Sequence, residues 1–182
     1  MKNNIALIGF MGAGKTVTGQ ALARLLHMDF VDTDDIIEQE AGTSIADIFA
    51  SKGEEAFRRI ETAAVRQACG RQYSVIACGG GVVLRPENTA LLKEAALVIY
   101  LETQPDAILK RVGSSGAARP LLNVDNPAST IAAMLAARGP LYKKAADLII
   151  DTTDLAAEAV AGQIKSELGR YEGFNLQKQN SR

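Results

Sequence analysis

Five short apolar runs, separated by longer amphipathic stretches, constrain the fold of this chain more than any other feature. The runs are rich in β-branched residues and cover residues 5–9, 29–32, 74–78, 96–102 and 148–151. We expect each to form a strand, because buried strands of a parallel sheet read as short apolar segments. Strands that alternate with helices predict an α/β fold, a three-layer sandwich around a parallel sheet.

The stretches between these runs have helical periodicity. Pro86 and Pro105 suit first-turn positions, and Thr103 and Thr153 are candidate N-caps. We expect helices over residues 15–27, 33–41, 44–51, 54–70, 86–93, 105–112, 128–144 and 154–170.

Length and composition favour one folded domain. The chain has 182 residues, of which 47% are apolar and 23% charged, as is usual for a globular protein. No linker or repeat divides it, so residues 1–171 are predicted to form a single domain. Residues 172–182 lack periodicity and are predicted to be a disordered tail.

Charge and cysteine content exclude several classes of function. The net charge of −1 provides no global positive field, so we expect neither nucleic acid nor membrane as a partner. No apolar run approaches 18 residues and the N-terminus does not resemble a signal peptide, so a cytoplasmic location is expected. A monomer is a separate expectation, which no sequence pattern carries. Cys69, Cys78 and the single histidine, His27, have no zinc-ligand spacing.

A phosphate-binding motif lies between the first predicted strand and the first predicted helix. Residues 9–16, Gly-Phe-Met-Gly-Ala-Gly-Lys-Thr, match GxxxxGK[ST] at every fixed position. Glycines let successive backbone N–H groups face an anion, and the helix N-terminus adds partial positive charge. We therefore predict binding of a nucleoside triphosphate by Gly12, Ala13, Gly14, Lys15, Thr16 and Val17. Lys15 would reach the β- and γ-phosphates, and the Thr16 hydroxyl would bind Mg²⁺.

Two aspartates follow the second predicted strand. Asp32 and Asp34 are two residues apart, so in an extended segment both carboxylates point to the same side. One, assigned to Asp32, can serve the metal, and the other, Asp34, can accept the proton of an attacking hydroxyl. The alternative is a helix N-cap by Thr33 or Asp34.

Further along the chain, charged and glycine residues predict an acceptor site and a lid. Arg58 and Glu61 are three apart on a helix, which permits contact but also describes an ordinary surface ion pair. Gly79, Gly80 and Gly81 would let a substrate approach the backbone closely, and Arg138 is a further cation. The flexible segment 113–120 ends in Arg119-Pro120, as expected of a mobile lid.

These residues together resemble the shikimate kinase family, and the likeness runs from residue 5 to about residue 168. The patterns that carry it are the motif at 9–16, Asp32-Thr-Asp34, Phe57-Arg58-x-x-Glu61, Gly79-Gly-Gly81, Arg119-Pro-Leu-Leu and Arg138-x-x-x-Tyr142. The resemblance implies a five-stranded sheet in the order 2-3-1-4-5, a shikimate-binding segment around 33–61 and a lid around 113–123.

The resemblance also implies roles for single residues. Asp34, Arg58, Gly80 and Arg138 would contact shikimate, with Glu61, Gly79 and Gly81 beside them. Lys15, Asp34 and Arg119 would be catalytic, and Arg111 would lie near adenine. The implied reaction is transfer of the γ-phosphoryl group of ATP to the 3-hydroxyl of shikimate, with Mg²⁺, in aromatic amino-acid biosynthesis. The alternatives are a gluconate kinase-like enzyme, whose substrate also pairs a carboxylate with hydroxyls, and a non-catalytic nucleotide-binding module.

Overall fold

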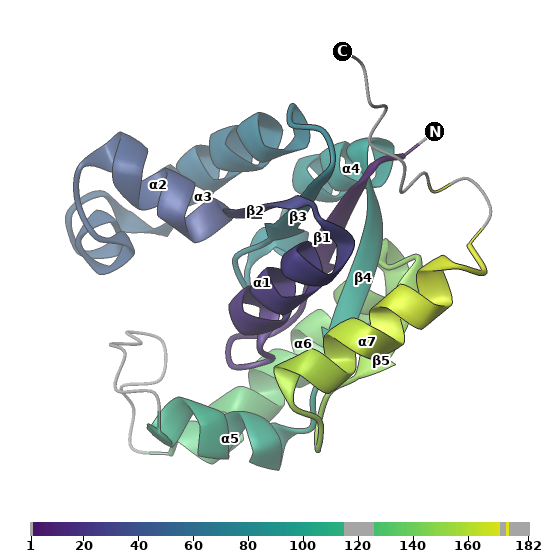
Figure 1. Cartoon of the computed structure of the whole chain (residues 1–182). Coiled ribbons are helices and arrows are strands. Elements are labelled where there is room, and N and C mark those ends of the chain that lie inside the picture. Colours follow the sequence, from purple (N-terminus) through teal and green to yellow (C-terminus); the bar gives the residue numbers. More distant parts are fainter. Residues whose placement is uncertain (1, 115–125, 172–173, 175–182) are drawn as a thin grey trace.

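The computed structural model describes residues 2–114, 126–171 and 174. Among these residues, five parallel strands form one sheet in the order β2-β3-β1-β4-β5 (Figure 1), which confirms the predicted fold class and strand order. The strands are β1 (Asn4–Ile8), β2 (Asp29–Asp32), β3 (Ser74–Ala77), β4 (Ala96–Glu102) and β5 (Leu148–Asp151). Each lies within one residue of its predicted bounds.

Helices connect the strands as predicted, with differences at some ends. They are α1 (Lys15–Leu26), α2 (Thr33–Ala41), α3 (Ile45–Cys69), α4 (Pro86–Ala95), α5 (Pro105–Ser114), α6 (Pro127–Ala145) and α7 (Ala157–Leu168), with a short 3-10 helix η1 (Val82–Leu84). Element α3 contains the two helices expected over 44–51 and 54–70, and its backbone leaves helical geometry between them, at Gly53. Helix α7 begins at Ala157 and not at 154, and its N-cap position is Ala156, so Thr153 does not cap it.

Side chains from alternate positions of the strands feed two hydrophobic cores. In β1, Ile5 and Leu7 belong to the core under α1 and α7, whereas Ala6 and Ile8 belong to the core on the other face. That second core includes apolar residues of α3, α4 and α6. Figure 1 shows the sheet between these helix layers. Because both faces are covered, the free ends of the strands are the places where a polar site can form.

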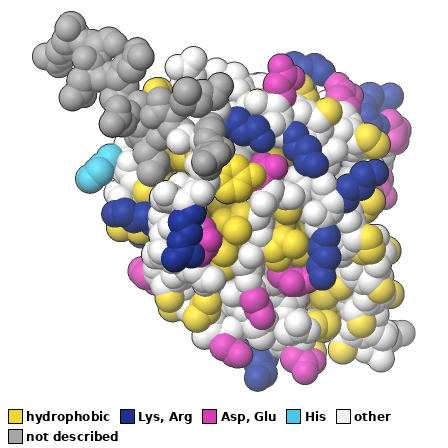
Figure 2. Space-filling model, turned by 90° about the vertical axis from the view of Figure 1, so that its right-hand side faces the viewer, with side chains coloured by type: hydrophobic (Ala, Val, Ile, Leu, Met, Phe, Trp, Pro, Cys, Tyr) yellow, Lys and Arg dark blue, Asp and Glu magenta, His cyan; other side chains and the backbone are white. Residues whose placement is uncertain are grey.

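The outer surface mixes charge types. On the face shown in Figure 2, Lys and Arg side chains are interspersed with acidic and apolar ones. Of the predicted tail, the structure describes Phe174, which forms a β-bridge with Lys2 and packs against the core under α1 and α7. Among the described helices, none has the length and apolar character needed to cross a membrane.

Candidate active site

The loop between β1 and α1 has the backbone of an anion cradle. Gly12 and Gly14 have φ values of 78° and 87°, and Ala13 between them has a negative φ. This alternation turns successive N–H groups toward one concave side, and most residues other than glycine would be strained at those positive φ values. Gly14 is also the N-cap of α1, so the positive end of the helix dipole faces the same side.

Lys15 and Thr16 open helix α1 beside this cradle. The Lys15 Nζ donates to the backbone carbonyls of Gly9 and Phe10 at 2.9 Å each, which holds the ammonium over the loop. The Thr16 hydroxyl donates to Asp32 Oδ2 at 2.9 Å. The end of the phosphate-binding motif and the end of β2 are therefore in direct contact. Val17 is exposed on the same first turn.

Asp32 has two structural partners. Besides Thr16, its carboxylate accepts the backbone N–H of Asp34 at 3.0 Å and caps α2. The alternative that Thr33 or Asp34 caps this helix is thus wrong. The hydroxyl of Thr33 instead accepts the N–H of Gly79 at 3.0 Å, which joins the ends of β2 and β3.

Asp34 lies partly buried between the two strand ends, with its backbone N–H taken by the cap. Burial, together with the negative charge of Asp32, raises the pKa of its carboxyl to about 6, while Lys15 acts in the opposite direction. A carboxyl with this pKa is a suitable proton acceptor near neutral pH.

Arg58 and Glu61 form a buried ion pair, so the interpretation as a surface pair is wrong. Arg58 is 6% exposed and Glu61 is 1% exposed, and Arg58 Nη1 donates to Glu61 Oε2 at 2.9 Å. Arg58 also contacts the exposed Glu54 at 3.0 Å. Burial raises the pKa of the Glu61 carboxyl, and Arg58 opposes that shift. Within the described chain Glu61 Oε1 has no hydrogen-bond partner.

At each of the three glycines after β3, the missing side chain leaves room for another group of this site. A Cβ on Gly79 would lie 2.8 Å from Asp34 Oδ1 and 3.1 Å from Glu61 Oε1, and one on Gly81 would overlap Arg58 Nη1. A Cβ on Gly80 would lie 3.2 Å from the backbone nitrogen of Met11, in the phosphate loop. The absence of side chains therefore lets Asp34, Glu61, Arg58 and the phosphate loop converge.

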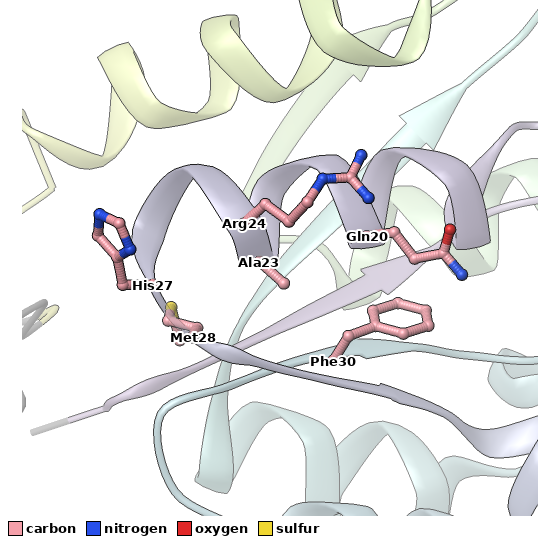
Figure 3. Close-up of a pocket in the computed structure, with 6 residues that line it drawn as sticks. All are labelled: Gln20, Ala23, Arg24, His27, Met28 and Phe30. Carbon is pink, nitrogen blue, oxygen red and sulfur yellow. The ribbon is translucent and has the colours of Figure 1, made fainter.

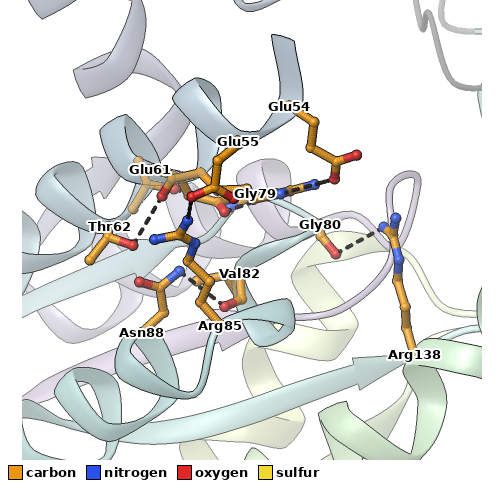
Figure 4. Close-up of polar contacts among 12 residues, drawn as sticks. Glu54, Glu55, Glu61, Thr62, Gly79, Gly80, Val82, Arg85, Asn88 and Arg138 are labelled. Atoms are coloured by element: carbon orange, nitrogen blue, oxygen red, sulfur yellow. Dashed lines mark hydrogen bonds and ion pairs between the residues drawn. The ribbon is translucent and has the colours of Figure 1, made fainter. Parts of the chain in front are cut away.

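Arg138 approaches the same glycine segment from α6. The Arg138 guanidinium lies 3.5 Å from the Gly80 carbonyl oxygen, a contact visible in Figure 4. It also lies over the Phe10 ring, with Cζ 5.9 Å from the ring centroid. One turn later, the buried Tyr142 donates its hydroxyl to that same carbonyl and stacks on Tyr100. Two cations from distant helices, Arg58 and Arg138, thus lie on the glycine segment near Asp34.

Arg111 lies at the other side of the phosphate loop. It donates to the carbonyl of Gly12 at 3.5 Å and to the carbonyl of Thr153 at 3.1 Å. It therefore contacts both the cradle and the turn after β5. The predicted lid residue Arg119, and most of the segment 113–123, lie outside the described residues.

A separate pocket of about 430 Å³ lies along α1 and the start of β2, around Gln20, Arg24, His27 and Phe30 (Figure 3). It contains none of the predicted site residues and sits at the amino end of β2, whereas the candidate site is at the carboxyl end. His27 is exposed there, as expected of a surface residue.

The residues present fit a magnesium ion whose ligands come partly from the protein and partly from a nucleotide. The described residues hold no cluster of three or more His, Cys, Asp or Glu side chains suited to a metal ion. Thr16 and Asp32 nevertheless bring a hydroxyl and a carboxylate oxygen together, and Mg²⁺ is usually held by one or two protein oxygens plus phosphate and water.

Glu54 and Thr33 have roles that the sequence analysis missed. Glu54 could have been found, because it precedes Arg58 by four residues on a helix. The hydroxyl of Thr33, which holds Gly79, gave no signal, since its partner is 46 residues away.

Comparisons with known proteins agree with this arrangement. The family model described as shikimate kinase matches residues 11–169. Shikimate kinase from Moorella thermoacetica is 46% identical over 92% of this chain and 95% of its own, and that from Caldanaerobacter subterraneus subsp. tengcongensis is 45% identical over 88% and 93%. The solved shikimate kinase from Acinetobacter baumannii, in complex with shikimate, superposes with a TM-score of 0.90 at 37% identity, covering 95% of this chain and 96% of that one. The chain therefore belongs to the shikimate kinase family.

Proposed function

We propose that this chain transfers the γ-phosphoryl group of ATP to the 3-hydroxyl of shikimate, giving shikimate 3-phosphate and ADP in aromatic amino-acid biosynthesis. The observation that carries the proposal is the convergence of a phosphate cradle, an aspartate with a raised pKa and two arginines at neighbouring strand ends.

On the nucleotide side, the backbone of residues 12–17 cradles the phosphates and Lys15 neutralises charge on the β- and γ-phosphates. Lys15 would leave the carbonyls of Gly9 and Phe10 for the phosphates, an exchange that keeps its donors satisfied. Arg111 lies beside adenine. Arg119 adds charge compensation on the transferring group when the lid around 113–123 closes and excludes water.

Thr16 and Asp32 would hold Mg²⁺, Asp32 directly or through water. The bound ion would offset negative charge on the phosphate oxygens. The Thr16–Asp32 hydrogen bond in the structure keeps both oxygens at the edge of the cradle.

On the acceptor side, Arg58 and Arg138 bind the carboxylate of shikimate. Guanidinium groups match a carboxylate through planar, charge-assisted hydrogen bonds. The Glu61 carboxylate holds the Arg58 guanidinium in place through their ion pair. Gly79, Gly80 and Gly81 let the shikimate ring approach the backbone. Asp34, just after the neighbouring strand β2, meets the hydroxyl that is phosphorylated.

Catalysis rests on positioning and charge compensation. Asp34 orients the acceptor hydroxyl and takes its proton as the oxygen attacks the γ-phosphorus. Because the transition state of phosphoryl transfer is loose, little covalent help is needed and alignment dominates. We propose that residues 1–171 act as one catalytic domain, with 33–61 as the shikimate-binding segment. The cytoplasmic location and the monomeric state remain predictions.

The test is a coupled assay of ADP release with shikimate or gluconate as acceptor and MgATP as donor. We expect turnover with shikimate and at least about a hundredfold lower kcat/KM with gluconate, since a mismatched acceptor loses transition-state contacts. Phosphorus NMR of the product identifies the phosphorylated hydroxyl.

Each outcome separates one reading from another. Preferential turnover of gluconate would favour the gluconate kinase alternative. A product phosphorylated at a different hydroxyl would overturn the positional assignment alone. Binding of ADP without turnover of either acid would indicate a nucleotide-binding module.

A further inference from the structure

Two buried threonine hydroxyls meet beyond the ends of β4 and β5. Thr103 and Thr152 are 4% and 2% exposed, and their Oγ1 atoms lie 2.7 Å apart. The strands pair with Glu102 opposite Asp151, so these threonines are the next residues along two neighbouring chains. Neither hydroxyl has a part in the function proposed above.

The hydrogen bonds of this pair can be assigned by counting protons. Thr152 Oγ1 lies 3.1 Å from the Glu102 carbonyl and 3.4 Å from the Ala13 carbonyl. Carbonyl oxygens only accept, so the single Thr152 proton is shared between these two carbonyls and Thr103 donates to Thr152. The Glu102 carbonyl also accepts the Thr152 backbone N–H at 2.8 Å. Ala13 is thus the contact that links this hydroxyl to the phosphate loop.

Holding the Ala13 carbonyl also sets the direction of the next N–H. The Ala13–Gly14 peptide is trans, and in a planar trans peptide the C=O and the N–H point in opposite directions. A carbonyl directed at Thr152 therefore turns the Gly14 N–H away from Thr152. With positive φ at Gly12 and Gly14, that direction is the concave side of the loop.

The turn that carries Thr152 is itself tied to the elements around it. The Gln104 N–H donates to Thr153 Oγ1 at 3.1 Å, and Thr153 Oγ1 donates to Asp151. Arg111 spans from this turn to the Gly12 carbonyl. Two consecutive carbonyls of the loop, those of Gly12 and Ala13, are thus held from the same side.

We propose that Thr152 is a positioning residue for nucleotide phosphate: its hydroxyl holds the Ala13 carbonyl and so directs the Gly14 N–H into the cradle. The proposal rests on the proposed function only in taking a nucleotide phosphate as the ligand of the loop. It assigns an effect on phosphate affinity to Thr152, in the turn after β5, although Thr152 and Ala13 are 139 residues apart in the sequence.

The test measures ADP binding by calorimetry for wild type, Thr152→Val and Thr152→Ser. Valine replaces the hydroxyl by a methyl group, so the Gly14 N–H loses its orientation and ADP binding should weaken about five- to tenfold. Serine keeps the hydroxyl and should bind ADP within about twofold of wild type. Shikimate affinity should be unchanged in both variants. Thr152→Ala removes the same hydroxyl with a smaller side chain and serves if the valine variant does not fold.

Thr103→Val is the matched control. It removes the other hydroxyl of the same buried pair and should lower stability by a similar amount, but it leaves the Thr152 proton shared between the carbonyls of Glu102 and Ala13. Its ADP affinity should stay within about twofold of wild type. The proposal would be overturned if ADP binding weakened equally in Thr103→Val and in the Thr152 variants that lack the hydroxyl. It would also be overturned if those Thr152 variants bound ADP with wild-type affinity. Because ADP binding needs no acceptor, a wild-type protein that binds ADP but leaves shikimate unphosphorylated would contradict only the proposed function.

Discussion

Asp34 illustrates how a few neighbouring charges tune a single carboxyl group. Its pKa is raised to about 6 by burial and by Asp32, with Lys15 opposing. If Asp34 is the general base, kcat/KM for shikimate should fall as the pH drops through about 6, because the proton acceptor is then occupied. A pH–rate profile at saturating MgATP measures this. Asp34→Asn should lower kcat by about 10²- to 10⁴-fold and remove that acidic limb. An unchanged limb in the variant would assign the titration to another group.

The same shift predicts an effect on stability. A folded-state pKa of about 6, above the ordinary value of 3.8, means that the ionised carboxylate is disfavoured in the native state. Its cost is absent below pH 3.8 and grows as the pH rises toward 6. Asp34→Asn should therefore stabilise the unliganded protein at pH 8 by at most about 3 kcal/mol, and by little at pH 3.5. Urea unfolding at both pH values measures the difference, and a gain of equal size at both would contradict the linkage.

Arg58 and Glu61 make a prediction that separates stability from binding. Arg58→Ala leaves the Glu61 carboxylate buried without its partner, so the free energy of unfolding should fall by about 3–5 kcal/mol. Adding Glu61→Gln removes the buried charge and should recover much of that loss. Shikimate binding should be weaker by about 10- to 150-fold in both the single and the double variant, since the charged hydrogen bond to the carboxylate is missing in each. Recovery of binding in the double variant would show that Arg58 acts only through the fold.

At the scale of elements, the break in α3 places Arg58 and Glu61. Gly53 has φ 77° and ψ 174° within a 25-residue helix, a conformation open essentially to glycine. Helix α2 packs against α3, and Figure 1 shows both projecting to one side of the sheet. The break therefore gives the first turns of α3 a direction different from that of the segment carrying Arg58 and Glu61.

This geometry predicts opposite effects for two glycine substitutions at sites where a Cβ meets no atom within 4 Å. Gly53→Ala should destabilise the protein by about 1–3 kcal/mol through backbone strain. Gly162→Ala, in the exposed middle of α7, should stabilise it by about 0.5–1 kcal/mol, since alanine loses less entropy in a helix. Chemical denaturation of both variants measures this. If Gly53→Ala stabilised the protein, alanine would adopt the backbone conformation of Gly53 without strain, and the prediction would be wrong.

At the scale of the whole molecule, each ligand should stabilise the fold through its own part of the site. MgADP or shikimate at a hundred times its Kd should add about 2.7 kcal/mol to the free energy of unfolding. Lys15→Ala should lose most of the MgADP effect and keep the shikimate effect, because Lys15 belongs to the phosphate side. Without ligand the Tm of this variant should change little, since the Lys15 ammonium donates to two carbonyls of its own loop, those of Gly9 and Phe10. Thermal unfolding with each ligand, and with EDTA to remove Mg²⁺, measures these shifts. Loss of the shikimate effect in Lys15→Ala would indicate a general loss of structure.

Local sequence patterns determined the elements and the ingredients of the site. The strands and most helix bounds follow from apolar periodicity, and the cradle follows from Gly12, Gly14, Lys15 and Thr16, which are close in sequence. The break between the two parts of α3 was also predicted, since separate helices were expected over 44–51 and 54–70.

Only the tertiary structure decided how those ingredients are paired. It made the Arg58–Glu61 pair buried, made Asp32 a cap, and turned Thr103 and Thr152 toward each other. Tyr142 and Gly80 are 62 residues apart and Thr152 and Ala13 are 139 apart, so no local pattern contains both partners. The strand order and register of the sheet bring them together, since parallel neighbours place distant residues at the same edge. Local chemistry is written in short spacings, whereas burial and long-range hydrogen bonding exist only after the strands have paired.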